Sequence, residues 1–185
     1  DEEMETWLIK TISNNLVEGT NIIAVEIHQV SDSSSDLAFD FKLSADKIYE
    51  ISEGEIWKYL DDGTDQGTSW YSTNFNDDTW SSGPASFGYG EDEVTTVSYG
   101  DNEDEKHITT YFRKTFDVTD PTEYDYMLFE AIRDDGMIVY LNGEKVWTNN
   151  MPDLFDYATE AITGINEEEG KWISSLQDNT LVTGT

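Results

Sequence analysis

A stretch of sequence near the start of the chain returns in diverged form near its end. Residues 2–20 align without a gap with residues 167–185, at an offset of 165, and 8 of the 19 positions are identical. Two unrelated segments of this length would share about one residue, so the chain contains an internal repeat. In the first copy the identical residues are Glu2, Glu3, Trp7, Asn14, Leu16, Val17, Gly19 and Thr20.

The segment that follows the first copy is expected to decide how the fold closes. Residues 21–30 alternate apolar and polar side chains, and residues 37–43 form a second alternating run, which is typical of β-strands. These two strands follow the first copy of the repeat, whereas the printed sequence stops after the second copy. We expect them either to fold back into their own domain, as in a circular permutant, or to complete a neighbouring molecule. The second arrangement is strand donation, which joins copies head to tail.

Composition narrows the classes of protein that need to be considered. The chain carries 40 acidic and 10 basic residues, a net charge of −30, so the phosphates of nucleic acids would be repelled. No apolar run approaches the ~18 residues of a membrane span, so membrane insertion is not expected. The acidic excess favours divalent cations or a saline habitat. The absence of cysteine rules out disulfides and thiolate metal sites.

Short strands separated by turn signals continue along the rest of the chain. Residues 109–118 alternate cleanly, residues 124–132 form another strand-like run, and Asn142-Gly143 marks a hairpin. This pattern predicts an all-β, antiparallel sandwich.

The predicted organisation has two parts. Residues 1–45 form an N-terminal extension that carries the closing strands, and residues 46–185 form the sandwich body. Residues 44–54 are expected to be a linker, and short helices are expected at residues 2–13 and 167–177.

Five short sequence motifs follow one another in the body in the same order as in a known family of domains. They lie at residues 54–63, 75–80, 87–90, 133–136 and 139–143. Together they resemble the galactose-binding-like jelly-roll modules of large secreted bacterial multidomain proteins. The resemblance implies a jelly-roll β-sandwich and an extracellular or cell-surface location. In those modules a phrase like residues 19–29 comes last, whereas here it comes first.

Two acidic loops are candidate calcium (Ca²⁺) sites, because calcium is bound by six to eight oxygen ligands. Asp134-Asp135 is similar to the Asp-Asp loop of calcium-dependent adhesin sandwiches, and Asn142 could add a ligand. The alternative is a tight turn in which Asp135 bonds its own backbone. The second loop contains three carboxylates without the glutamate of a full calcium loop, and a solvated turn is its alternative. Its residues are Asp61, Asp62 and Asp65.

Other side chains are candidates for sugar binding and ion pairing. Trp70, Trp80 and Trp147 could stack on sugar rings, or they could belong to the core. If their strands are neighbours, Glu26 and Arg113 could form an ion pair. No nucleophile elbow, zinc-binding helix or phosphate loop is present, so an enzyme is not expected.

These observations predict a non-catalytic extracellular structural module that assembles head to tail by strand donation, as a filament subunit or a surface-protein repeat. Its partners would be other copies of the chain or neighbouring repeats. The alternative is a calcium-assisted carbohydrate-binding module with glycans as partners. The apolar residues expected to enter the acceptor groove are Ile23, Val25, Ile27, Leu37, Phe39, Phe41 and Leu43.

Overall fold

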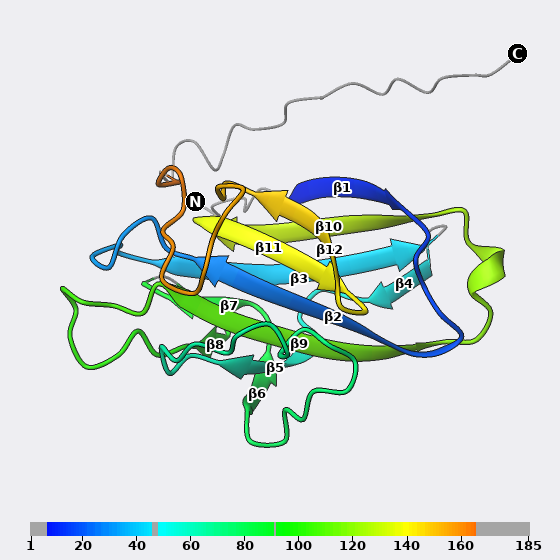
Figure 1. Cartoon of the computed structure of the whole chain (residues 1–185), viewed down its shortest axis with the longest axis horizontal. Coiled ribbons are helices and arrows are strands. Elements are labelled where there is room, and N and C mark those ends of the chain that lie inside the picture. The colour runs from blue at the N-terminus through cyan, green and yellow to red at the C-terminus, as the bar shows by residue number, and fades with distance from the viewer. Residues whose placement is uncertain (1–6, 46–47, 91, 166–185) are drawn as a thin grey trace, which may run out of the picture.

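The computed structural model describes residues 7–45, 48–90 and 92–165, which form a sandwich of two six-stranded β-sheets (Figure 1). The expected all-β sandwich is therefore confirmed. Sheet A contains β1 (Leu8–Ser13), β3 (Leu37–Ala45), β4 (Ile48–Ile51), β7 (Phe87–Tyr89), β8 (Thr95–Thr96) and β10 (Tyr126–Asp134). Sheet B contains β2 (Gly19–His28), β5 (Ile56–Leu60), β6 (Ser81–Pro84), β9 (Thr109–Val118), β11 (Gly136–Leu141) and β12 (Glu144–Asn149). Within the described ranges, the helical structure is one 3₁₀ turn at Pro121–Glu123.

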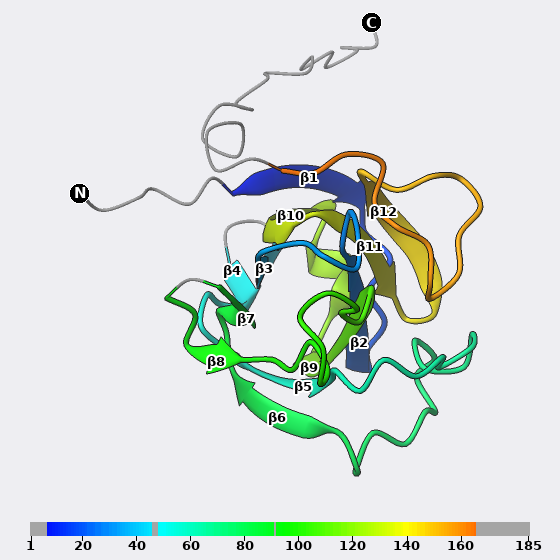
Figure 2. The ribbon, with the colours of Figure 1, turned by 90° about the vertical axis from the view of Figure 1, so that its left-hand side faces the viewer.

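The two closing strands lie inside the sheets rather than at their edges. Sheet B has the order β12-β11-β2-β9-β5-β6, so β2 is hydrogen-bonded on both sides. Sheet A has the order β1-β10-β3-β7-β8, with β4 also pairing with β3. Figure 2 shows β10 and β3 across the interior from β2 and β9. In this structure, residues 21–43 complete the sandwich of their own chain.

The alternation of apolar and polar residues along residues 21–30 correctly predicts which side chains of β2 face the core. Ile23, Val25 and Ile27 point into the core between the sheets, whereas Ala24 belongs to a second apolar cluster on the outer face of sheet B. Aromatic rings connect the sheets across the core. The ring centroids of Phe39 and Phe112 are 4.3 Å apart.

Loops cover the outer face of sheet B. Trp70 and Trp80 from the loop after β5 pack there, together with Met151 and Ala161 from the chain after β12. β2 is consequently buried on both faces, and even its polar residues Glu26 and His28 are 4% and 0% exposed.

The structure differs from the sequence-based expectations at the N-terminus and in the segment after β3. The helix expected at residues 2–13 is wrong, because residues 8–13 form strand β1 on the free edge of β10. That edge offers unpaired backbone groups, and the β-branched residues Ile9, Thr11 and Ile12 favour a strand there. The expected linker at 44–54 includes strand β4. The helix expected at 167–177 lies outside the described residues.

The Asn142-Gly143 hairpin is confirmed. The φ angles of Asn142 and Gly143 are 52° and 92°, and a type I′ turn requires positive φ at both central residues.

Candidate functional site

The first candidate site is the groove filled by the closing strands. All seven apolar residues expected at the donation interface are at most 1% exposed and belong to the central core. β2 is paired with β9 from Gly19↔Val118 to His28↔Thr109, and its other edge is paired with β11. Without residues 21–43, sheet B would lose the strand between β9 and β11, and sheet A the strand between β10 and β7.

The segment between β1 and β2 is attached to the body by polar contacts. The Asn14 side-chain amide donates to the carbonyl oxygens of Pro121 at 2.6 Å and Tyr124 at 2.8 Å. The carboxamide of Asn21 is fully buried, donates to Val17 O at 2.8 Å and accepts from Asn142 Nδ2 at 2.9 Å. Residues 14–21 are therefore an integral part of the closure.

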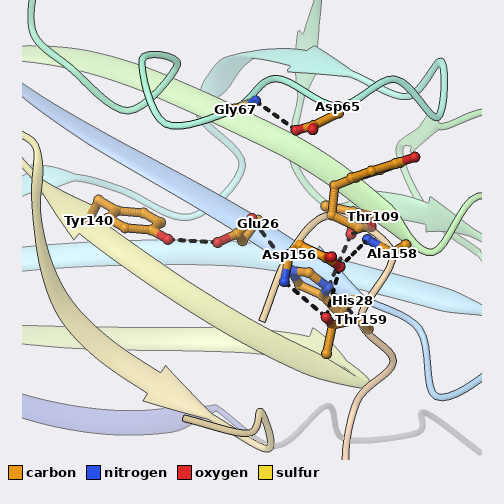
Figure 3. Close-up of polar contacts among 10 residues, drawn as sticks. Glu26, His28, Asp65, Gly67, Thr109, Tyr140, Asp156, Ala158 and Thr159 are labelled. Carbon is orange, nitrogen blue, oxygen red and sulfur yellow. Dashed lines mark hydrogen bonds and ion pairs between the residues drawn. The ribbon is translucent and has the colours of Figure 1, made fainter. Parts of the chain in front are cut away.

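A buried polar cluster lies on the outer face of β2 (Figure 3). The Tyr140 hydroxyl donates to Glu26 Oε1 at 2.7 Å, and Glu26 Oε2 is 3.4 Å from His28 Nε2. His28 Nδ1 is 2.8 Å from Thr159 O and 3.0 Å from Thr109 Oγ1. Burial, followed by the charge of Glu26, raises the pKa of Tyr140 above its usual range. The cluster connects β2, β9 and β11 to the loop after β12.

The expected Glu26–Arg113 ion pair is wrong, although β2 and β9 are neighbours as that expectation required. The register places Ala24 opposite Arg113 and Glu26 opposite Tyr111. Arg113 Nε instead donates to Asp77 Oδ2 at 2.8 Å, and its guanidinium also donates to Trp70 O. The pair holds the loop after β5 against the sheet.

The Asp134-Asp135 loop lies between β10 and β11, away from the third ligand expected there. Asn142 is at the opposite end of β11, where its Oδ1 accepts from Ile22 N at 2.9 Å. Asp135 uses both carboxylate oxygens, each at 2.7 Å, to accept from the backbone amides of Val30 and Ile165. Asp135 therefore binds the backbone of two distant segments rather than its own backbone, which differs from the tight-turn alternative.

Asp134 has a different environment from Asp135. Its Oδ1 is buried and has no hydrogen-bond partner in the part of the chain that the structure describes. Burial first, and then the neighbouring carboxyls of Asp135 and Asp36, raise the pKa of Asp134 to about 9. The Asp134 carboxyl also interacts electrostatically with the Tyr89 hydroxyl and the Arg133 guanidinium. Among the described residues, no three His, Cys, Asp or Glu side chains are close enough together to hold a metal ion.

The raised pKa of Asp134 predicts a stability that falls as the pH rises. In the unfolded chain this carboxyl would ionise near pH ~4. The native state therefore holds the extra proton between about pH 4 and about 9, and over that range the contribution is lost progressively, by at most about 1.4 kcal/mol per pH unit. Asp134→Asn should flatten this slope and be the more stable protein at pH 8. Urea unfolding of both proteins from pH 5 to pH 9 checks this, and two parallel curves would contradict it.

The other acidic loop uses its carboxylates for local backbone bonds. Asp62 Oδ1 accepts from Thr64 N at 3.0 Å, and Asp65 Oδ1 accepts from Gly67 N at 2.7 Å. Asp61 Oδ2 is directed elsewhere, to Ser98 N at 2.6 Å. This geometry resembles the solvated-turn alternative.

The three tryptophans expected as candidates for sugar stacking do not share an exposed surface. Trp70 and Trp80 belong to the outer cluster of sheet B, and Trp147 belongs to the central core. Their exposed fractions are 1%, 5% and 7%, so their faces are covered by neighbouring side chains.

Comparisons with protein-family models, curated proteins and solved structures found no match to this chain. Among the described residues there is no helix of the length and apolar character needed to cross a membrane.

Proposed function

We propose that the chain is a non-catalytic extracellular structural module that assembles head to tail by strand donation, as a filament subunit or a repeat of a surface protein. The observation that carries the proposal is the position of residues 21–43. They supply an interior strand to each sheet, yet they come before the body in sequence and continue into it through residues 44–54. The resemblance to galactose-binding-like modules supports the extracellular location.

The energetics favour a long-lived joint. Burying an apolar side chain of this size contributes about 1.5–3 kcal/mol. The seven residues of the donated face are all buried, so together they contribute on the order of 10 kcal/mol before ordering costs. Because the closed chain buries the same residues, this term largely cancels from the balance between monomer and polymer, and it acts instead by making release of the donated strands slow.

The closed and donated forms would use the same strand pairs. A donated β2 would meet β9 and β11 of its neighbour in the register seen here within one chain. The forms differ in the connection between β3 and β4, where Ala45 pairs with Ile48 across only two intervening residues. Donation requires this connection to open, which makes it the hinge. Closure within one chain is favoured at low concentration, and donation at high concentration.

Solution mass and shape test the proposal. Light scattering and negative-stain microscopy at increasing protein concentration should reveal linear species whose mass grows in steps of one chain, 21.1 kDa. A monomer at every concentration, including after partial unfolding and refolding at high concentration, would refute strand donation.

Asp134 supports a second candidate, a calcium-assisted carbohydrate-binding module. The carboxyls of Asp134, Asp135 and Asp36 are neighbours, and one oxygen of Asp134 lacks a partner in the described ranges. Calcium would replace the proton that Asp134 otherwise holds.

Calorimetry with calcium alone should show binding that is lost in Asp134→Asn, and a glycan array with and without EDTA would then test for sugars. No heat with calcium and no glycan signal would eliminate this candidate.

A further inference from the structure

We propose that the groove along the edge of β10, which β1 fills in this structure, is also the binding site of residues 172–185, the part of the second copy of the repeat that aligns with residues 7–20. The inference deepens the proposed assembly and rests on it only for the fate of the displaced strand. β1 covers that edge from Leu8↔Ala131 to Ser13↔Tyr126. Two segments of the same chain would thus be alternative occupants of one groove.

The residues shared by the two copies include those that hold the first copy in place. The Lys42 ammonium lies 3.5 Å from the centroid of the Trp7 ring. Asn14 bonds two carbonyl groups of the body, and Leu16 belongs to the central core. Gly19 has a φ of +88°, a conformation that favours glycine. The second copy repeats all four residues as Trp172, Asn179, Leu181 and Gly184.

The positions that differ are mostly those that face solvent. Ile9 is 64% exposed and becomes Ser174, and the exposed Thr11 becomes Leu176. The partly buried Leu8 becomes Ile173, an apolar residue of similar size.

One buried position is less well matched in the second copy. Ile12 packs against the core, and Gln177 takes its place. The second copy therefore carries the main contacts of the groove, and the first copy is the stronger occupant.

The chain is long enough for the second copy to reach its own groove. Ile165 is held at Asp135, directly after the end of β10, by a bond of 2.7 Å to the Asp135 carboxylate. β1 begins opposite Ala131, four residues back along β10, or about 13 Å away plus one strand spacing of about 5 Å. The seven residues from Ile165 to Trp172 span up to about 23–25 Å. Figures 1 and 2 show the orange end of the described chain on the same side of the molecule as the start of β1.

Exchange at this groove adds a third strand to the proposed joint. When residues 172–185 occupy the β10 edge of their own body, residues 7–20 are released from it. The released copy is continuous with β2 and β3 and is the stronger occupant, so in the molecule that receives them it displaces that molecule's own second copy from the β10 edge.

Engineered disulfides distinguish the two occupants, because the full chain contains no cysteine. Leu128 of β10 pairs with Thr11, whose counterpart in the second copy is Leu176. We would compare Leu128→Cys/Leu176→Cys with the reference Leu128→Cys/Thr11→Cys. A matched control is Leu128→Cys/Thr183→Cys, since Thr183 aligns with Glu18, beyond the strand. Each protein is oxidised, and the disulfide is quantified by mass spectrometry in the isolated monomer fraction.

We expect the 128–176 disulfide to exceed the 128–183 control, and to increase further when Trp7→Ala weakens the first copy. A 128–176 signal no greater than the control, even with Trp7→Ala, would overturn the inference. Because the disulfide is scored within monomers, an absence of polymers would count against the proposed function alone.

Thermal unfolding of alanine variants gives a second measurement. Asn179→Ala should be nearly silent by itself, and it should lower Tm clearly when Asn14→Ala is present, because Asn179 then replaces Asn14. If Asn179→Ala is equally silent in both backgrounds, the second copy does not use the groove.

Discussion

Replacing Phe39 by alanine should lower the free energy of unfolding by about 3–5 kcal/mol. Phe39 is 0% exposed and sits where the sheets meet, with its ring centroid 5.3 Å from that of Trp57 and 4.3 Å from that of Phe112. The neighbouring rings come from β5 and β9 and cannot collapse into the space without distorting sheet B. Chemical denaturation followed by tryptophan fluorescence measures the loss.

Ile56 provides the matched control for Phe39. It is a large apolar residue of β5 that is 63% exposed, so Ile56→Ala should change stability by no more than about 0.5 kcal/mol. Equal losses in the two variants would show that Phe39 is not at the centre of the core.

The same substitution has a distinct consequence for assembly. Phe39 meets the same groove whether β3 closes its own body or a neighbour's, so its loss weakens both forms equally. Phe39→Ala should therefore accelerate exchange of subunits between labelled polymers with little change in the balance between monomer and polymer. A large shift toward monomer would mean that the joint uses contacts different from those of the closed chain.

Replacing Arg113 by methionine should cost about 3 kcal/mol of stability, the second-largest effect that we expect. The Arg113 side chain is 2% exposed and its guanidinium lies 5.1 Å from the centroid of Phe75. Methionine would fill much of the volume, but it would leave the Asp77 carboxylate and the Trp70 carbonyl without their donor. The loop after β5 should loosen and become a site of early proteolysis.

Lys114, the next residue along β9, supplies the control for Arg113. Its ammonium is 3.0 Å from Glu55 Oε2, and the side chains of Lys114 and Glu55 are 15% and 42% exposed, against 2% for Arg113. An ion pair this close to solvent contributes about 0–1 kcal/mol, so Lys114→Ala should be well tolerated. Denaturation and limited proteolysis of the two variants should separate them clearly, and identical behaviour would contradict the assigned role of Arg113.

Strand positions were the most predictable part of the fold. The alternation of residues 21–30, 37–43 and 109–118 identified β2, β3 and β9, because a strand between two layers must segregate its side chains with a period of two. The two positive φ angles required at Asn142-Gly143 made the β11–β12 hairpin equally recognisable.

Features that depend on long-range packing were not predictable. β1 became a strand because of the β10 edge, which lies more than 100 residues away. Whether Arg113 faces Glu26 or Ala24 depends on the register between β2 and β9, and local alternation does not specify that register.

The burial of the tryptophans could not be predicted from the sequence either. Trp70 and Trp80 are covered because loops fold back onto sheet B, and loop paths leave no periodic signal. The Asp77 partner of Arg113 could have been sought among the carboxylates near those tryptophans, since a buried guanidinium requires an acceptor.

Strand donation is tested most directly by a disulfide that can form only between two chains. Thr20 of β2 and Asp117 of β9 are exposed partners, with Thr20 Oγ1 donating to Asp117 Oδ1 at 2.7 Å. Thr20→Cys and Asp117→Cys would be made in separate proteins of different mass, mixed after brief unfolding, refolded together at high concentration and oxidised. We predict the mixed Thr20–Asp117 disulfide as the main product. Only monomers in this mixture, together with a complete intrachain disulfide in the protein that carries both cysteines, would contradict strand donation.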